Sequence, residues 1–122
     1  MATIKSYTDI EQSKKLAEIL PLESADMHWL NLPSIGDVAI NNPYVKDNGA
    51  TEGILPCWSL AALFSTLPLI DFIRPILIGT PKMLYKCIYK CIYNDDLKSH
   101  AYDNPIDACY EMILKLNELN LL

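Results

Sequence analysis

The C-terminal segment carries the pattern that most constrains how this chain can fold. Residues Asn104-Pro105-Ile106-Asp107 are typical of a helix start, because an Asn side chain satisfies free amides there and proline in the first turn has none to lose. The apolar residues in this segment recur at helical spacing: Cys109, Met112, Ile113, Leu116 and Leu119. The pattern predicts a helix whose apolar stripe closes a hydrophobic core.

Length and composition indicate one folded domain. The chain has 122 residues, of which 51% are hydrophobic and 20% charged, and this profile is opposite to that of a disordered segment. A chain of this length is also the size of one typical domain. We therefore expect a single domain over residues 1–122, which folds alone or with a second copy of itself.

The charge balance disfavours nucleic acid as a partner. Ten Lys and Arg against fifteen Asp and Glu give a formal net charge of -5, and the basic residues are scattered except for Lys14-Lys15 and the series Lys82, Lys86 and Lys90. Nucleic-acid binding usually needs a basic surface that displaces counterions from phosphates. We expect no nucleic-acid partner.

Cysteine usage and the N-terminal residues predict a cytoplasmic protein. The start of the chain lacks the apolar run of a secretory signal. The cysteines lie in core-like segments and not in the loop-rich setting of a disulfide scaffold: Cys57, Cys87, Cys91 and Cys109. We expect them to be reduced thiols.

The uncharged run Ile54–Ile70 raises the question of a membrane span. A spanning helix needs about 20 consecutive apolar residues. Here Pro56 and Pro68 interrupt the run, and Asp71 follows it. A buried helix followed by a buried strand fits this pattern better, so we expect no membrane association.

Start and stop signals predict a helix in the N-terminal part of the chain. Thr8-Asp9-Ile10-Glu11 has the spacing of a capping box, and Pro21 cannot continue the hydrogen-bond ladder, which places a helix over residues 9–20. Residues 22–53 contain many Pro, Gly, Asn and Asp residues and read as short strands separated by turns. The strand candidates are Met27–Leu30 and Val38–Ile40, with a turn at Asp47-Asn48-Gly49.

A further helix is predicted in the centre of the chain. Apolar residues repeat at three and four positions from Cys57 to Leu67, and Pro56 lies where its missing amide would go unused. The opposite face is also apolar, so this helix should be enclosed on most sides. We expect it to end at Pro68.

Residues 84–93 repeat a tetrapeptide and read LYKC-IYKC-IY. The period fits a strand, with Tyr85, Cys87 and Tyr89 on one face, and it also fits a helix that stacks Cys87 on Cys91. We favour the strand, because Tyr, Ile and Cys suit a half-buried sheet and no clear N-cap is present. Arg74–Ile78 would then form the preceding strand of a hairpin.

Together these elements predict an α+β fold, in which a small antiparallel sheet is covered on one face by about three helices. The Tyr and Cys face of the repeat should lie under the helices. The other face carries Leu84, Ile88 and Ile92 between lysines, and this row is our candidate interaction surface.

Three segments resemble short uncharacterised proteins that are encoded by phages and integrated mobile elements of gut Bacteroidetes bacteria. They are Asp9–Met27 (DIEQSKKLAEILPLESADM), Leu55–Leu67 (LPCWSLAALFSTL) and Asn104–Leu122 (NPIDACYEMILKLNELNLL), nearly half of the chain. The segments His28–Ile54 and Pro68–Asp103 lie outside the resemblance. It implies a small intracellular protein of phage or mobile-element origin with helices around a small sheet, and it supplies no catalytic or ligand residues.

Candidate chemistry is sparse in this chain. Cys57 at a helix start could act as a nucleophile with His28 or His100 as its base, but neither histidine lies in a recognisable local signature. Zinc binding would need ligands at metal spacing, and Cys87 and Cys91 would be about 13 Å apart on a strand. His100, near Asp95, Asp96 and Asp103, reads as part of a solvated turn.

The sequence therefore predicts no catalytic residue, no cofactor-binding residue and no metal ligand. Phosphate-binding loops, serine-hydrolase elbows and zinc-protease motifs are also missing from it. Our leading hypothesis is a non-enzymatic accessory protein that binds another protein or a second copy of itself, and no small-molecule ligand can be inferred. The alternative is a small thiol-dependent enzyme that uses Cys57 with a histidine.

Overall fold

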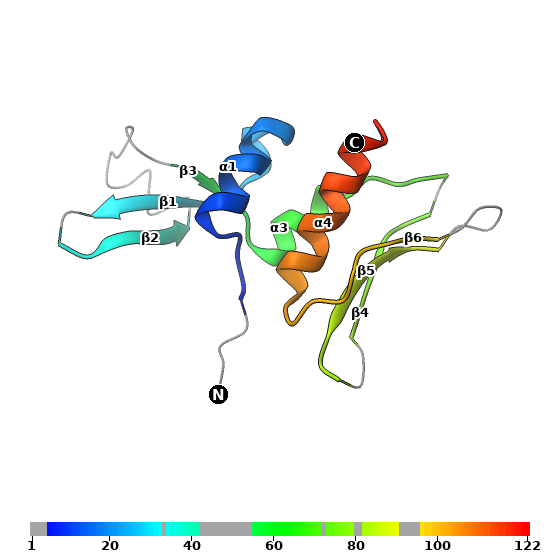
Figure 1. Ribbon diagram of the computed structural model, residues 1–122. Helices are drawn as coiled ribbons and strands as arrows, with labels where there is room; N and C mark the ends of the chain where they lie inside the picture. Colours follow the sequence, from blue (N-terminus) through cyan, green and yellow to red (C-terminus); the bar gives the residue numbers. More distant parts are fainter. Residues whose placement is uncertain (1–4, 33, 42–54, 72, 80–81, 91–95) are drawn as a thin grey trace.

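Among the residues that the structure describes, two small antiparallel sheets flank a group of three helices (Figure 1). The computed structural model describes residues 5–32, 34–41, 55–71, 73–79, 82–90 and 96–122. The helices are α1 (Ile10–Ile19), α3 (Leu60–Ser65) and α4 (Pro105–Glu118), with a short 3-10 turn η1 (Leu22–Ser24). The strands are β1 (Met27–Leu32), β2 (Gly36–Asn41), β3 (Leu55–Cys57), β4 (Ile76–Gly79), β5 (Tyr85–Tyr89) and β6 (Leu97–Lys98). The α+β class predicted from the sequence is confirmed.

The strands divide between two sheets, whereas the sequence predicted one. The first sheet has the order β2-β1-β3 and the second β4-β5-β6, and every pairing is antiparallel. The division arises because β3 returns to β1, where Cys57 lies opposite Met27, and α3 follows directly. The strands that come after α3 pair only with one another among the described residues.

Helix α4 forms as its sequence pattern predicts. The side chain of Asn104 accepts a hydrogen bond from the amide of Asp107 at 2.8 Å, and Pro105 occupies the first turn. The residues of the predicted stripe from Cys109 to Leu116 are buried, but Leu119 is exposed because it caps the helix end. The helix packs against β5 and α3 and so covers the inner face of the second sheet (Figure 1).

The start of α1 corrects a sequence prediction by one residue. The helix is confirmed, but its capping box is Asp9 with Gln12 and not Thr8 with Glu11. Thr8 is fully buried, and its hydroxyl accepts a hydrogen bond from the amide of Trp58 at 3.1 Å. The side chain of Thr8, which the local pattern predicts as the N-cap of α1, therefore makes a tertiary contact with Trp58 instead.

The central helix starts later than predicted. Cys57 belongs to β3, and α3 begins after Ser59, whose hydroxyl accepts a hydrogen bond from the amide of Ala62 at 3.3 Å. The prediction that Cys57 lies at a helix start was therefore wrong. The physical reason is that the backbone around Cys57 pairs with β1, which no local signal in this segment reveals.

Most of the remaining strand predictions are confirmed where the structure describes them. The strand predicted over Arg74–Ile78 forms as β4, but it starts only at Ile76, and the expectation of a buried strand was wrong because Ile76 and Ile78 lie exposed at an edge of the sheet. Strands β1 and β2 include the candidates Met27–Leu30 and Val38–Ile40, and the repeat forms β5 and not a helix. Cys87 and Tyr89 are fully buried on the predicted inner face. The turn at Asp47-Asn48-Gly49 and the end of the repeat, from Cys91 to Tyr93, lie outside the described residues.

One hydrophobic core joins the three helices to the second sheet. Its buried side chains include Leu16 from α1, Leu63 from α3, Tyr89 from β5 and Met112 from α4. Trp58 is fully buried within it and donates its indole N–H to the Ser24 hydroxyl at 2.9 Å.

Within the described part of the chain, none of the helices has the length and apolar character that crossing a membrane requires.

Candidate interaction surface

Helix α3 is apolar on both faces, but only one face is covered. Leu63 is fully buried in the core, whereas Leu60 and Phe64 are half-buried and Ala61 is exposed. An apolar face that the fold leaves partly open is a common feature of surfaces that bind other proteins. The surface around α3 is therefore the strongest candidate for a functional site.

An open groove runs between α3 and β4. Its volume is about 600 Å³, and it is lined by Leu60, Ala61, Phe64, Ser65 and Leu77. The one polar side chain, Ser65, donates its hydroxyl to the Ala61 carbonyl at 2.7 Å. The lining therefore favours an apolar ligand, because its polar side chain already has a partner within the helix.

The groove continues past the end of α3. A second hollow of about 390 Å³ shares Phe64 and Ser65 with the first and extends along Leu67, Leu69, Arg74 and Pro75. We refer to the two together as the α3–β4 groove. Arg74 is an exposed charged side chain that lines the second hollow, so the groove combines a mainly apolar lining with one basic residue.

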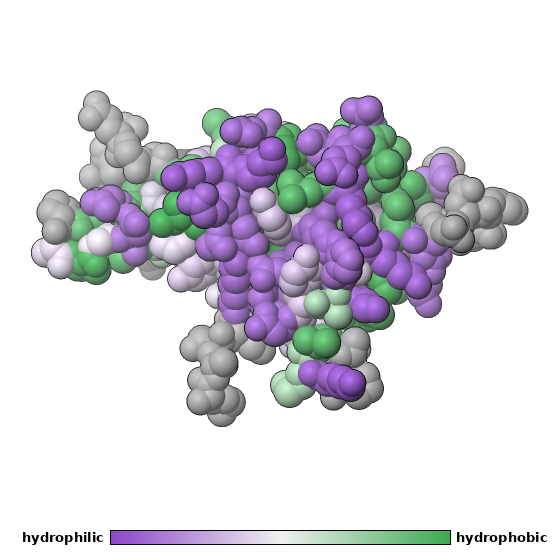
Figure 2. Space-filling model, viewed as in Figure 1, coloured by the Kyte–Doolittle hydropathy of each residue, from purple (hydrophilic) through white to green (hydrophobic). Residues whose placement is uncertain are grey.

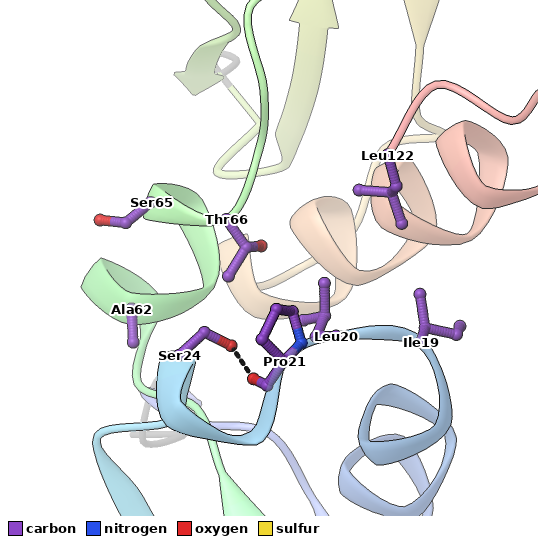
Figure 3. A pocket seen from close by; sticks show the side chains of 8 residues that line it. All are labelled: Ile19, Leu20, Pro21, Ser24, Ala62, Ser65, Thr66 and Leu122. Carbon is purple, nitrogen blue, oxygen red and sulfur yellow. Dashed lines mark hydrogen bonds between the residues drawn. The ribbon is translucent and has the colours of Figure 1, made fainter.

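A separate hollow lies on the other side of α3, between this helix and the end of α1 (Figure 3). It has a volume of about 560 Å³ and is lined by Ile19, Leu20, Pro21, Ser24, Ala62, Ser65, Thr66 and Leu122. The Ser24 hydroxyl donates to the Pro21 carbonyl at 2.5 Å, and the Thr66 hydroxyl donates to the Leu63 carbonyl at 2.7 Å. Its hydroxyl groups thus bond within their own turns, and the hollow offers mainly apolar surface.

Figure 2 shows how hydrophilic and hydrophobic residues are distributed over one face of the molecule. Hydrophilic residues cover most of α1 and α4 on this face, and hydrophobic residues gather beside the C-terminal end of α4. Three leucines at the C-terminal end of the chain are exposed: Leu119, Leu121 and Leu122.

The row predicted as an interaction surface offers little area in the described structure. Ile88 is only 5% exposed, Leu84 is half-buried, and Ile92 lies outside the described residues. The more exposed apolar residues of the same sheet face are Ile76 at 40% and Ile78 at 37%. Sequence reasoning missed these two, although the alternation of Ile76-Leu77-Ile78 carries the signal.

Cys57 lies in surroundings that do not favour a reactive thiolate. The side chain is fully buried, and its Sγ contacts the Thr8 hydroxyl at 3.7 Å and the Thr8 carbonyl at 3.5 Å. Burial raises the pKa of the Cys57 thiol, although hydrogen bonds with Thr8 and Ser13 partly oppose this shift.

The described geometry does not bring a histidine base to Cys57. His28 lies opposite Pro56 in the sheet, so its side chain leaves the sheet on the face opposite to that of Cys57. His100 has an 82% exposed side chain, and its Nδ1 lies 2.6 Å from Glu111 Oε1.

His100 belongs to a polar cluster whose main partner was not predicted. Glu111 from α4 also accepts a hydrogen bond from the His100 amide at 2.8 Å, and it lies 3.7 Å from the Lys115 ammonium. Burial disfavours the charged form, but hydrogen bonds from His100 and Tyr102 lower the pKa of Glu111. The cluster ties the segment before α4 to the helix. Glu111 faces His100 because of its place in α4, and no local sequence motif predicts this contact.

Neither a search for metal sites nor a comparison with known proteins assigns a function to this chain. Over the described residues, no group of three His, Cys, Asp or Glu side chains is placed to hold a metal ion. No protein-family model, no curated protein and no solved structure matches the chain.

Proposed function

We propose that this protein is a non-enzymatic binding module that recognises another protein through the α3–β4 groove. The observation that carries the proposal is the half-open apolar face of α3, where Leu60, Ala61 and Phe64 border a groove of about 600 Å³. Contiguous apolar surface beside a groove is typical of protein-binding sites, and a protein partner would bury it.

The internal bonding of the groove supports a binding role over a catalytic one. Ser65 bonds within α3, and Arg74 is the one charged side chain among the residues that line the two hollows. A reaction site needs a nucleophile, an acid or a base directed at the substrate. A mainly apolar lining with one basic side chain supplies shape and orientation instead.

The wider context of the proposal rests on the sequence. The resemblance of three segments to proteins of phages and mobile elements supports an accessory role of that origin, acting in the cytoplasm. A second copy of the chain would also satisfy the general proposal, because self-association is one form of protein binding.

A display experiment tests the proposal. Immobilised wild-type protein should enrich defined motifs from a random peptide library, and the Ala61→Asp variant should lose this enrichment by about tenfold or more, because it places a charge on the groove floor. Asp near the first turn of α3 also suits the helix dipole, so the fold should persist.

The control is Ser34→Asp, which adds the same charge at an exposed turn between β1 and β2. It should enrich the same motifs as the wild type. If no motif is enriched by the wild type, or if Ala61→Asp enriches the same ones, the groove is not a protein-binding site.

A further inference from the structure

Strand β4 forms one edge of the second sheet, directly beside the α3–β4 groove. Within the described part of the chain, β4 pairs only with β5. It has the sequence Ile76-Leu77-Ile78-Gly79, with no charge and no proline inside it. Proteins usually protect an edge strand with such residues, so an unprotected edge is suited to pairing with another strand.

The hydrogen bonds of β5 show which groups of β4 face the open edge. Tyr85 exchanges two backbone hydrogen bonds with Tyr102, at 2.6 and 3.0 Å, and the Cys87 carbonyl accepts from the Ser99 amide at 2.9 Å. Tyr85 and Cys87 therefore direct their backbone groups away from β4. Because direction alternates along a strand, Lys86 and Ile88 direct theirs toward β4.

The same alternation continues into β4. Ile78 lies opposite Lys86, and Ile76 lies opposite Ile88, so the backbone groups of these two residues are used within the sheet. The backbone N–H and C=O groups of Leu77 and Gly79 consequently point to the open edge. They form a ready template for one further strand.

The side chains at this edge fit the same kind of ligand. Leu77 lines the α3–β4 groove together with Leu60 and Phe64. In a strand added beside β4, the residue opposite Leu77 would lie on the same face of the sheet and enter the groove. The groove thus provides a pocket for alternate side chains, and the edge provides the backbone hydrogen bonds.

The charged side chains near β4 indicate which residues should flank the bound segment. The chain carries a formal net charge of -5. Yet between Leu69 and Lys98 the described residues include only two acidic side chains, Asp71 and Asp96. The basic side chains next to β4 or on the adjacent strand and its ends are Arg74, Lys82, Lys86 and Lys90, and we refer to them as the basic rim. A second copy would place this basic rim against itself, whereas an acidic partner would be attracted to it.

We propose that β4 binds an extended segment of a partner protein, which adds to the sheet as a fourth strand; this inference rests on the proposed function. The segment is apolar at alternate positions and is flanked by acidic residues. The backbone of the segment pairs with Leu77 and Gly79. Its inward side chains enter the α3–β4 groove, and its acidic flanks face the basic rim.

Synthetic peptides test this directly by isothermal titration. One peptide alternates valine and threonine between glutamate pairs, a second has lysine pairs instead, and a third is an amphipathic helical peptide with glutamate flanks. The glutamate-flanked extended peptide should bind more tightly than either of the others by about tenfold or more at low salt. Tightest binding by the helical peptide, no binding by any peptide, or equal binding regardless of flank charge would overturn the inference.

Hydrogen exchange locates the contact. On binding of the extended peptide, the amides of Leu77 and Gly79 should gain protection, and those of Ile76 and Ile78 should change little because they already pair with β5. Protection that appears elsewhere and leaves Leu77 and Gly79 unchanged contradicts strand addition.

A matched pair of variants tests the contribution of the Gly79 backbone N–H to binding. Gly79→Pro removes the outward N–H and should weaken binding of the extended peptide by about tenfold, whereas Gly79→Ala keeps it and should bind within about twofold of the wild type. The added Cβ of the alanine meets only Tyr85 Cε1, at 3.9 Å. Equal binding by both variants, with unchanged melting temperatures, contradicts the inference.

The two proposals fail differently. If the random library yields motifs that depend on Ala61 but the extended peptide does not bind, protein binding by the groove stands and strand addition does not. If the library yields nothing and the peptide does not bind, both proposals are rejected.

Discussion

The side chains of Cys87 in β5 and Cys109 in α4 are both fully buried, and the two thiols influence each other's pKa. This contact joins the middle strand of the second sheet to the helix that covers it. The interaction with Cys87, together with burial, raises the pKa of the Cys109 thiol far above its ordinary value. The pair is therefore an element of the core that fixes α4 on the sheet.

A double-mutant cycle should detect this contact. Cys87→Ala and Cys109→Ala should each lower the free energy of unfolding by about 1 kcal/mol, and their coupling energy should be about 0.5 to 1 kcal/mol. Urea unfolding of the four proteins measures both quantities. Cys109→Ala combined with Ser34→Ala, at an exposed turn, should show no coupling. A coupling near zero in the first cycle would show that the two thiols act independently.

Alkylation of Cys57 tests the alternative of a thiol-dependent enzyme. Because the side chain is buried and burial raises the pKa of its thiol, iodoacetamide at neutral pH should modify Cys57 about a hundredfold more slowly in the folded protein than in urea. Site-resolved mass spectrometry measures each rate. A folded-state rate above that of the unfolded chain would instead support a reactive nucleophile.

The fold was predictable where local signals decide the structure. Asn104, Pro105 and the stripe from Cys109 to Leu116 lie within one helix, so capping and periodicity sufficed to place it. Cys57 lies in a strand and not in a helix because it pairs with Met27. Thr8 does not cap α1 because its hydroxyl accepts a hydrogen bond from the amide of Trp58. Such contacts between distant segments leave no mark on local periodicity.

The candidate site was less predictable than the fold. Alternation correctly placed Ile88 on the outer sheet face, but alternation does not report how far neighbouring side chains cover it. The open side of α3 could not be found from its sequence either, because the helix is apolar all round. Only the positions of β4 and α4 show that Leu63 is covered and Ala61 is not.

The carboxylate of Asp107 should make stability depend on pH. It accepts hydrogen bonds from Lys5 at 2.9 Å, from Gln12 at 2.7 Å and from Asn104 at 2.9 Å. Burial opposes the charged form, but hydrogen bonds from Asn104, Lys5 and Gln12 outweigh it and lower the pKa of Asp107. This stabilisation is present above the ordinary aspartate pKa of about 3.9 and is lost as the pH falls through the lower folded-state value.

Asp107→Asn should therefore lower the free energy of unfolding by about 1 kcal/mol at pH 7, and by progressively less as the pH falls below about 4. Urea unfolding between pH 7 and pH 2.5 measures the difference. Glu18→Gln serves as the control, since the Glu18 side chain is 73% exposed. A difference between wild type and Asp107→Asn that stays constant over this range would contradict the assignment.

The hydroxyl of Thr8 should contribute more to stability than any exposed hydroxyl. It accepts from the Trp58 amide at 3.1 Å and lies 2.8 Å from the Ser13 hydroxyl, with no exposure to water. Thr8→Val keeps the shape but leaves the Trp58 amide without this partner, which should cost about 1 to 3 kcal/mol and lower the melting temperature by about 5 to 15 °C. Ser6→Ala, at an exposed position, should change it by less than about 2 °C. If both variants melt together, the hydroxyl of Thr8 does not hold the N-terminal segment to β3 and α3.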